Sequence, residues 1–413
     1  MSIQRLVVDN VRPFDSRQGR LGPPSRIVIE SGRIAEVTAE PRKVDDAQRI
    51  DGGGRVALPG LIDAHVHVTA ASHDLMRLAL QPPSLTTAES SRIMHDMLQR
   101  GFTAVRDAGG ADFGLQAAVA QGLFDGPRLF IAGFPVSQTG GHADMRPMGV
   151  RQREFFCTCA GLGLIGAIAD GVGDVRRAVR EQVRNGANQI KIMAGGGIAS
   201  PSDPLEGTQF SLDELRAACE EADAANLYTM AHAYSPRAVT RAVQAGVRSI
   251  EHGNLIDEAT AKVMKTEGAY LVPTLSTYAA LADEGERLGW SPAMLNKLAV
   301  VGERGIEAVR IASAVGVPVV FGTDLLGHMH ARQSGEFALR QQAMSAVQVL
   351  QSATWIAARL MRQDGQLGEL VAGAFADLLV VEGDPTQELS MLARPAGLRV
   401  IVQGGRVVKN TLA

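Results

Sequence analysis

The sequence predicts an α/β fold, namely a TIM-type (β/α)8 barrel with a small β-sandwich domain formed from both termini. Three observations predict it. Apolar runs alternate with helical patterns through the middle of the chain, which is typical of βα units and a parallel sheet. Short strand patterns bounded by turn residues fill both ends instead. The length of 413 residues suits one large barrel with an appendage.

The two ends of the chain share one pattern. Residues 1–58 contain RLVVDN, RIVIESGRIAEV and RIDGGGRVALPG, and residues 366–413 contain ADLLVVEGDP and LRVIVQGGRVV. Neither end has enough strands for an independently stable sheet. We therefore expect the two ends to form one discontinuous β domain, which leaves residues 59–365 for the barrel.

Eight apolar runs in the middle are the predicted barrel strands. They are LIDAHVHV (61–68), FTAVRDAG (102–109), PRLFIAGFPVS (127–137), QIKIMAGGG (189–197), LYTMAHAY (227–234), RSIEHGN (248–254), AYLVPTLS (269–276) and VPVVFGTD (317–324). The helices between them have clear signals, such as the capping box of Ser211 and Glu214. Two long connections, 138–170 and 278–297, are expected to be binding loops or lids.

Composition excludes several classes of protein. A net charge of −3 gives no electrostatic reason to expect nucleic acid or an anionic membrane as a partner. The N-terminus lacks the pattern of a signal peptide, and no run reaches the roughly 18 apolar residues of a transmembrane helix. The default location is the cytoplasm. Three cysteines indicate no disulfide framework, and Cys157 and Cys159 lack a second pair for a metal site, so we expect buried or loop thiols.

Histidines gather at the C-terminal ends of the predicted strands, where barrel active sites lie. Seven of the nine do so: His65, His67, His142, His232, His252, His328 and His330. Because side chains alternate along a strand, His65 and His67 share a face, together with Asp63. Two imidazoles on one face at a barrel mouth can bind one metal. The alternative is a pair of half-exposed polar residues.

Other strands offer further candidate ligands. His232 ends the fifth run, His252 the sixth and Asp324 the eighth, each beside small residues. Histidine and carboxylate are ligands for zinc and other divalent ions. Four histidines and one aspartate exceed what a single catalytic zinc needs, because a catalytic site keeps one position open. Two metals would explain the count.

Lys191 stands in the middle of an apolar strand and requires its own explanation. An ammonium group cannot ligate a cation, since it has three donors and no acceptor. A buried lysine can lose its proton, and a neutral amine can react with CO2 to give an anionic carbamate that bridges two metals. The alternative is a salt bridge to Asp324 or Glu251. The residues alone leave both interpretations open.

The ordered set of motifs resembles the amidohydrolase superfamily. LPGLIDAHVHV, the lysine of IKIMAGGG, AHAY, EHGN, GTD and GQLGELVAGAFADLLVVEGDP carry this resemblance over almost the whole chain. They are most similar to the imidazolonepropionase-related branch, which contains Xaa-Pro dipeptidases, carboxypeptidase-like prolidases and ochratoxin amidases. The resemblance implies two divalent ions, expected to be Zn2+, and a homo-oligomer, with an octamer suspected. It implies these metal ligands: His65, His67, Asp324, carboxylated Lys191 as the bridge, His232 and His252.

The resemblance also implies a reaction. The expected enzyme is a metal-dependent amidohydrolase that cleaves dipeptides or N-acyl amino acids and releases a C-terminal amino acid. The leaving groups that the resemblance implies are proline, as for a prolidase, a basic residue, or an aromatic one such as phenylalanine, as in ochratoxin A-type amide hydrolysis. A hydroxide bridging two divalent ions is a nucleophile near neutral pH. Asp324 would take its proton and later deliver it to the leaving amine.

Candidate substrate-binding residues are less sharply defined. His142, in the loop after the third run, resembles a family histidine and would orient the scissile carbonyl or a carboxylate. The Tyr234 hydroxyl would bind the α-carboxylate or the oxyanion, unless Tyr234 is a core residue. His330 and His328 compete as carboxylate ligands, because His330-Ala331 and Gln333 depart from the family pattern.

The predicted pocket wall is apolar. Ser72 and Ile198 are expected there by position, and Leu325, Leu326 and Met329 add to it. This composition favours apolar or aromatic leaving groups. Two alternatives stay open: a cyclic-amide hydrolase or deaminase of the same superfamily, and a metal-free scaffold on the same barrel.

Overall fold

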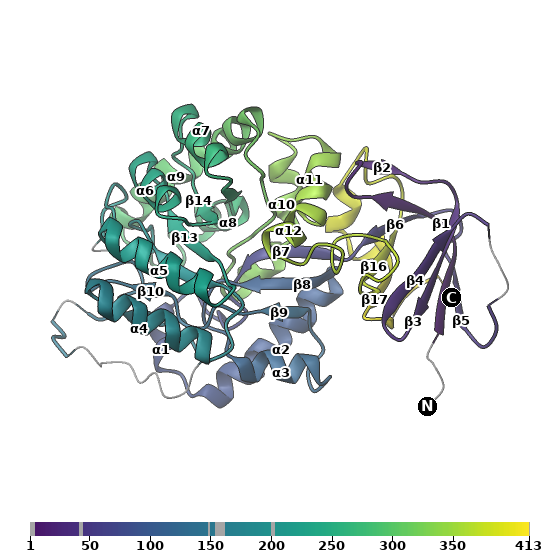
Figure 1. Ribbon diagram of the computed structural model, residues 1–413, viewed down its shortest axis with the longest axis horizontal. Coiled ribbons are helices and arrows are strands. Elements are labelled where there is room, and N and C mark those ends of the chain that lie inside the picture. The colour runs from purple at the N-terminus through teal and green to yellow at the C-terminus, as the bar shows by residue number, and fades with distance from the viewer. Residues whose placement is uncertain (1–4, 41–43, 148, 153–161, 200–202, 413) are drawn as a thin grey trace.

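The computed structural model describes residues 5–40, 44–147, 149–152, 162–199 and 203–412. Cys157 and Cys159 lie outside these ranges. Strands from both ends of the chain form a sheet that lies beside a larger, helix-rich part (Figure 1). None of the helices within the described ranges is long and apolar enough to cross a membrane.

The terminal sheet joins the two ends of the chain, as the sequence predicted. Its described strands follow the order β18 (Arg406–Asn410), β17 (Leu398–Gln403), β16 (Leu378–Val381), β6 (Val56–Pro59), β1 (Arg5–Asp15), β3 (Ser25–Glu30) and β4 (Arg33–Thr38), and β2 (Arg20–Leu21) and β5 (Gln48–Asp51) pair with β1. β16 pairs antiparallel with β6, so that Leu378 faces Pro59. The apolar faces of these strands form a core of their own, which includes Val8, Ile27 and Val400.

Parallel strands form the centre of the larger part. One sheet has the order β11 (Ala167–Ile168), β10 (Val136–Ser137), β12 (Ile190–Met193), β13 (Thr229–Ala233), β14 (Ser249–His252) and β15 (Tyr270–Val272). A second has the order β7 (Leu61–Val66), β8 (Phe102–Asp107) and β9 (Arg128–Phe130). Neighbours in both sheets run parallel, which confirms the α/β class.

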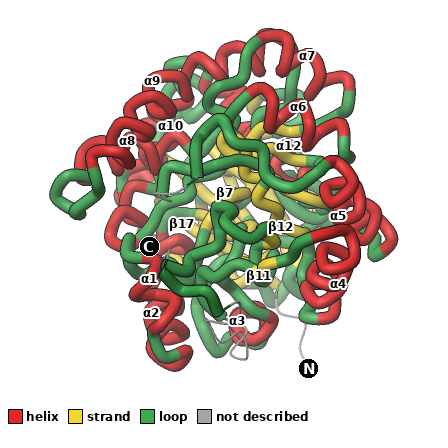
Figure 2. The backbone as a smooth tube through the Cα atoms, turned by 90° about the vertical axis from the view of Figure 1, so that its left-hand side faces the viewer, coloured by secondary structure: helices red, strands yellow, loops and turns green. Residues whose placement is uncertain are grey.

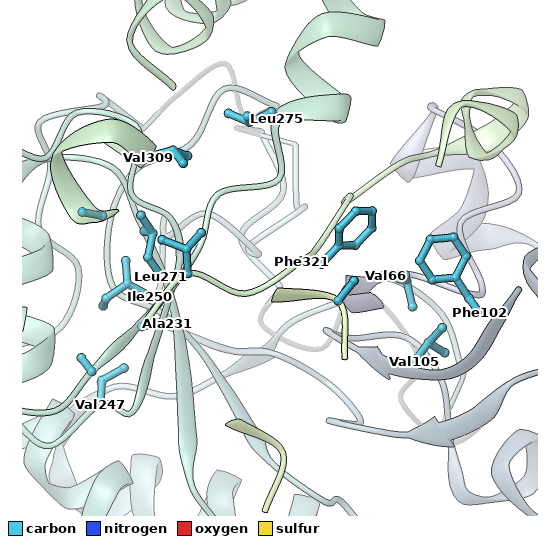
Figure 3. Close-up of a cluster of buried hydrophobic side chains, with 14 of the residues drawn as sticks. Val66, Phe102, Val105, Ala231, Val247, Ile250, Leu271, Leu275, Val309 and Phe321 are labelled. Atoms are coloured by element: carbon cyan, nitrogen blue, oxygen red, sulfur yellow. The ribbon is translucent and has the colours of Figure 1, made fainter. Parts of the chain in front are cut away.

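Helices surround these strands (Figure 2). In the described part of the chain they are α1 (Leu75–Leu80), α2 (Pro83–Gln99), α3 (Phe113–Ala120), α4 (Gly171–Arg184), α5 (Leu212–Ala224), α6 (Pro236–Gln244), α7 (Glu258–Thr266), α8 (Leu275–Glu284), α9 (Pro292–Val315), α10 (Gly335–Arg340), α11 (Ala346–Ser352) and α12 (Trp355–Leu360). The capping box predicted at α5 is present, since Ser211 and Glu214 bond each other's backbone N–H groups. Apolar faces of the helices and strands share one core (Figure 3), in which the Phe102 and Phe321 rings lie 5.5 Å apart.

Two predicted strands differ in detail. The run 127–137 divides into β9 and β10, which belong to different sheets, because Gly133 adopts a left-handed backbone (φ 69°) and Pro135 follows it. The run 317–324 is not a regular strand. It still connects the two sheets, since Val320 N donates to Leu271 O and Ala64 N donates to Phe321 O. Closure into a (β/α)8 barrel, the sandwich and the domain bounds remain predictions.

Candidate metal centre

One group of potential metal ligands comes from the C-terminal end of β7 and from the end of the eighth run. His65, His67 and Asp324 each offer one atom, and these atoms all lie within 4.8 Å of one another. Oδ1 of Asp324 lies 3.3 Å from Nε2 of His65 and 3.2 Å from Nε2 of His67. Asp324 N donates to the carbonyl of His65, and its backbone is left-handed (φ 54°). Strained residues of this kind cluster at functional sites.

The remaining ring nitrogens of the two histidines are already bonded. Nδ1 of His65 donates to Oε2 of Glu251 at 2.7 Å, and Nδ1 of His67 donates to the carbonyl of Gly109 at 2.8 Å. Nε2 is therefore the nitrogen of each ring that faces Asp324 and remains for a metal ion. Metal-bound histidines almost always donate their second N–H in this way, so this donor set fits a divalent ion.

His232 and His252 end the next strands, β13 and β14, and lie beside the first group. Nε2 of His232 donates to the carbonyl of Gly196 at 3.0 Å, which leaves Nδ1 for a metal. Nδ1 of His252 pairs with the Thr274 hydroxyl at 2.8 Å, which leaves Nε2. The rings of His65 and His252 are 5.1 Å apart, and those of His232 and His252 are 4.7 Å apart. All four histidines thus border one space.

Lys191 lines the same space from β12. Its side chain is only 2% exposed. Burial lowers the pKa of the amine to about 8, against the opposing pull of Glu251 and Asp324. The neutral amine is therefore accessible near physiological pH, which fits the chemistry of a carbamate. A direct ion pair between Lys191 and either carboxylate does not occur among the described contacts.

The neighbours of Asp324 and His67 shift the pKa values of both groups. Burial would raise the pKa of Asp324, but the imidazoles of His65, His67 and His252 outweigh it and hold that pKa well below its usual value. Burial also lowers the pKa of His67, yet its hydrogen bond and charge contact with Asp324 leave it raised overall. A carboxylate that stays ionised among imidazoles is suited to binding a cation.

Glu251 accepts a hydrogen bond from His65 and is itself bonded by Arg106. The sequence did not predict this supporting role. Both are fully buried. Nη2 of Arg106 donates to both oxygens of Glu251 at 2.9 and 3.0 Å, and its Nε donates to the carbonyl of Ala64. Burial opposes ionisation of Glu251, but the Arg106 charge holds its pKa at about 2. The signal available in the sequence was two charged residues inside apolar strands, one of them directly before His252.

A cavity opens above the histidines. Its described lining comprises His65, His67, Leu75, Pro135, His142, Ala143, Met145, Leu164, Ile165, Lys191, Met193, Ile198, Ala199, His232, Tyr234, His252, Thr277, Tyr278, Leu281, Trp290, Asp324 and Leu326. The six predicted metal ligands and three predicted substrate residues, His142, Tyr234 and Ile198, therefore share it. The ring of His142 stacks on that of His232 at 4.2 Å.

Three predicted substrate residues do not reach the described cavity wall. Nε2 of His330 donates to the carbonyl of Ala70, and burial lowers its pKa to about 4. His328 pairs with Glu284. The Ser72 hydroxyl accepts from the backbone of Asp74.

The glycines after Lys191 were expected to leave space for substrate. At Gly197 that space holds the ring of His142 instead, because a Cβ there would lie 1.8 Å from Cε1 of His142.

Comparison with known proteins identifies the family of this chain. The model of the Amidohydrolase family matches residues 56–408. Ochratoxinase of Aspergillus niger is 31% identical over 409 residues, which cover 94% of this chain and 84% of that protein. A prolidase crystallised with N-methylphosphonate-L-proline is 47% identical with a TM-score of 0.95, covering 98% of this chain and 100% of its own. A Xaa-Pro dipeptidase with methionine in its active site is 27% identical with a TM-score of 0.88, at coverages of 98% and 100%. The chain belongs to the amidohydrolase family, whose members are generally metal-dependent, and it is a hydrolase that acts on C–N bonds.

Proposed function

We propose that the protein is a binuclear metal-dependent amide hydrolase that releases an apolar or aromatic C-terminal amino acid from dipeptides or N-acyl amino acids. One observation supports this most directly: six ligand-type side chains and an apolar wall meet at one cavity. The prolidase and the ochratoxinase to which the chain is similar support the amide bond as target. Two Zn2+ ions and carboxylation of Lys191 are part of the proposal, as is a homo-oligomer.

The ligand set suggests how the site would work. His65, His67 and Asp324 would hold one ion, His232 and His252 the second, and Lys191 would bridge them. When bound, divalent ions lower the pKa of water and polarise a carbonyl. Asp324 has a second carboxylate oxygen, Oδ2, which lies 4.0 Å from Nδ1 of His252. Through it Asp324 would accept the proton of the attacking water and pass it to the leaving amine.

The cavity wall supports an apolar leaving group. Ile165, Met193, Ile198, Leu281, Trp290 and Leu326 contribute apolar surface. Among the described lining residues, Asp324 is the acidic side chain, and it belongs to the metal site. A basic leaving group would therefore bring a charge into the cavity without a carboxylate to pair it.

The test combines metal analysis with a matched substrate panel. We expect about two divalent ions per chain and hydrolysis of N-acyl-phenylalanine and Xaa-Pro amides, with N-acyl-arginine much slower. His65→Ala should lose metal and activity, whereas His95→Ala, an exposed histidine of α2, should retain both. Turnover of ring amides or aminopurines alone would refute the proposed reaction. A chain that binds no divalent ion would support the scaffold alternative.

A further inference from the structure

A pair of buried tyrosines lies at the edge of the metal centre. Tyr278 belongs to α8, in the long connection that sequence analysis marked as a binding loop, and Tyr234 follows β13. The Tyr278 hydroxyl donates to the Tyr234 hydroxyl at 3.0 Å. The two residues are only 3% and 2% exposed, yet both line the cavity.

The ring of Tyr234 is fixed between two predicted metal ligands. It stands edge-on to His232 at 5.0 Å and stacks on His252 at 5.3 Å. This contact places the Tyr234 side chain against the two histidines that would hold the second ion. A tyrosine hydroxyl has an ordinary pKa of about 10, so it carries a proton near neutral pH and can act as a donor.

The hydrogen bonds around the pair run in one direction. If His252 binds metal through Nε2, its Nδ1 carries the proton and donates to the Thr274 hydroxyl. The Thr274 hydroxyl keeps a proton of its own to donate, and the Tyr278 hydroxyl donates to Tyr234. The Tyr234 oxygen is then an acceptor on this side. Its own proton has no acceptor among the hydrogen bonds of the described residues, which leaves it for the cavity.

We propose that Tyr278 is a positioning residue, whose hydroxyl turns the Tyr234 proton into the cavity toward an anionic oxygen of the substrate. This inference rests on the proposed function, because Tyr234 must meet substrate there. Without Tyr278, the Tyr234 hydroxyl could rotate and donate its proton to another acceptor. Preorganised donors of this kind act through their fixed direction, since no reorganisation is needed when charge develops.

The experiment is a double-mutant cycle with Tyr234→Phe, Tyr278→Phe and the double variant. Each is measured by hydrolysis of N-acyl-phenylalanine and by calorimetric binding of N-methylphosphonate-L-proline. A hydrogen bond to a charged oxygen predicts losses of about 10- to 100-fold in kcat/KM for each single variant. The kcat/KM of the double variant should fall no further than that of Tyr234→Phe. In both single variants the loss should be divided between kcat and KM in the same way.

Tyr270→Phe is the matched control, because Tyr270 is a buried tyrosine at the opposite, N-terminal end of β15. It should leave activity and phosphonate binding unchanged. Additive losses, or a Tyr278→Phe enzyme as active as Tyr270→Phe, would overturn the proposal. If wild type binds the phosphonate but hydrolyses no amide, the proposed function fails, while the binding cycle still tests the tyrosine pair. If wild type does not bind the phosphonate at all, the pair serves no such oxygen and the inference fails.

Discussion

One methyl group at Gly197 should displace His142. A Cβ at that position would lie 1.8 Å from Cε1 and 2.1 Å from Nδ1 of the His142 ring. Carbon atoms in favourable contact are about 3.5 Å apart. The ring would therefore have to move by roughly 1.7 Å, the difference between about 3.5 Å and 1.8 Å.

That movement would disturb the contacts that hold the imidazole in place. His142 stacks on His232, its backbone N–H donates to Gln209, and its Nδ1 lies 3.3 Å from Oδ2 of Asp203. A misplacement of about 1 Å can cost about 100-fold in rate. We thus expect Gly197→Ala to lower kcat/KM for N-acyl-phenylalanine about 100-fold while the bound metal is retained, because Gly197 offers no side-chain ligand.

Steady-state kinetics, metal analysis and thermal unfolding check this prediction. Gly195→Ala is the control, because its Cβ would meet Cα of Ala233 at 3.3 Å and Cβ of Ala238 at 3.4 Å, so that these neighbours need to shift by only a few tenths of an ångström. The control should keep most of its activity. A Gly197→Ala enzyme with wild-type kcat/KM would refute the reasoning, since the ring would then be free to move without consequence.

Two further predictions concern the buried charges. Lys191→Ala should lower activity at least about 100-fold and reduce the metal content. A short-chain carboxylic acid should partly restore activity by occupying the bridging position. Undiminished activity of the variant would exclude the bridging role of Lys191. The pKa of Glu251 falls from 4.5 to about 2 on folding, so its stabilisation is complete above pH 4.5 and is lost as pH falls toward 2. Metal-free wild type should therefore lose about 2 kcal/mol of unfolding free energy between pH 6 and pH 3 through this group. In denaturant unfolding, the free energy of Glu251→Gln should not show this decrease over the same pH range.

Period and topology suffice to predict that the histidines and Asp324 of the candidate metal centre lie together. Alternation places His65 and His67 on one face, and the C-terminal ends of parallel strands gather the other ligands. The supporting pair of Arg106 and Glu251 was not predicted, because its role depends on which strands face each other. Sequence distance alone does not show that Arg106 meets a carboxylate on β14.

Where the structure differs from the sequence predictions, at His328, His330 and the run 127–137, the causes are equally local. His328 and His330 stand two residues apart after the eighth run, but they belong to a 3-10 turn, Gly327–Arg332, and not to a strand. The period of two that placed His65 and His67 together therefore did not apply. His328 pairs with Glu284, and His330 bonds the carbonyl of Ala70. Likewise, the run 127–137 contained Gly133 and Pro135, whose effect on a strand can be expected from their backbone preferences.

The pairing of β6 with β16 has a consequence for the order in which the protein folds. β6 is followed almost directly by β7, the strand that carries His65, and it lies between β1 and β16. During synthesis the β16 segment leaves the ribosome after every predicted metal ligand. The first histidines therefore stand on a chain whose anchoring strand lacks one neighbour until β16 has been synthesised. Because such distant pairing forms late, we expect a chain that stops before β16 to bind divalent ions only weakly.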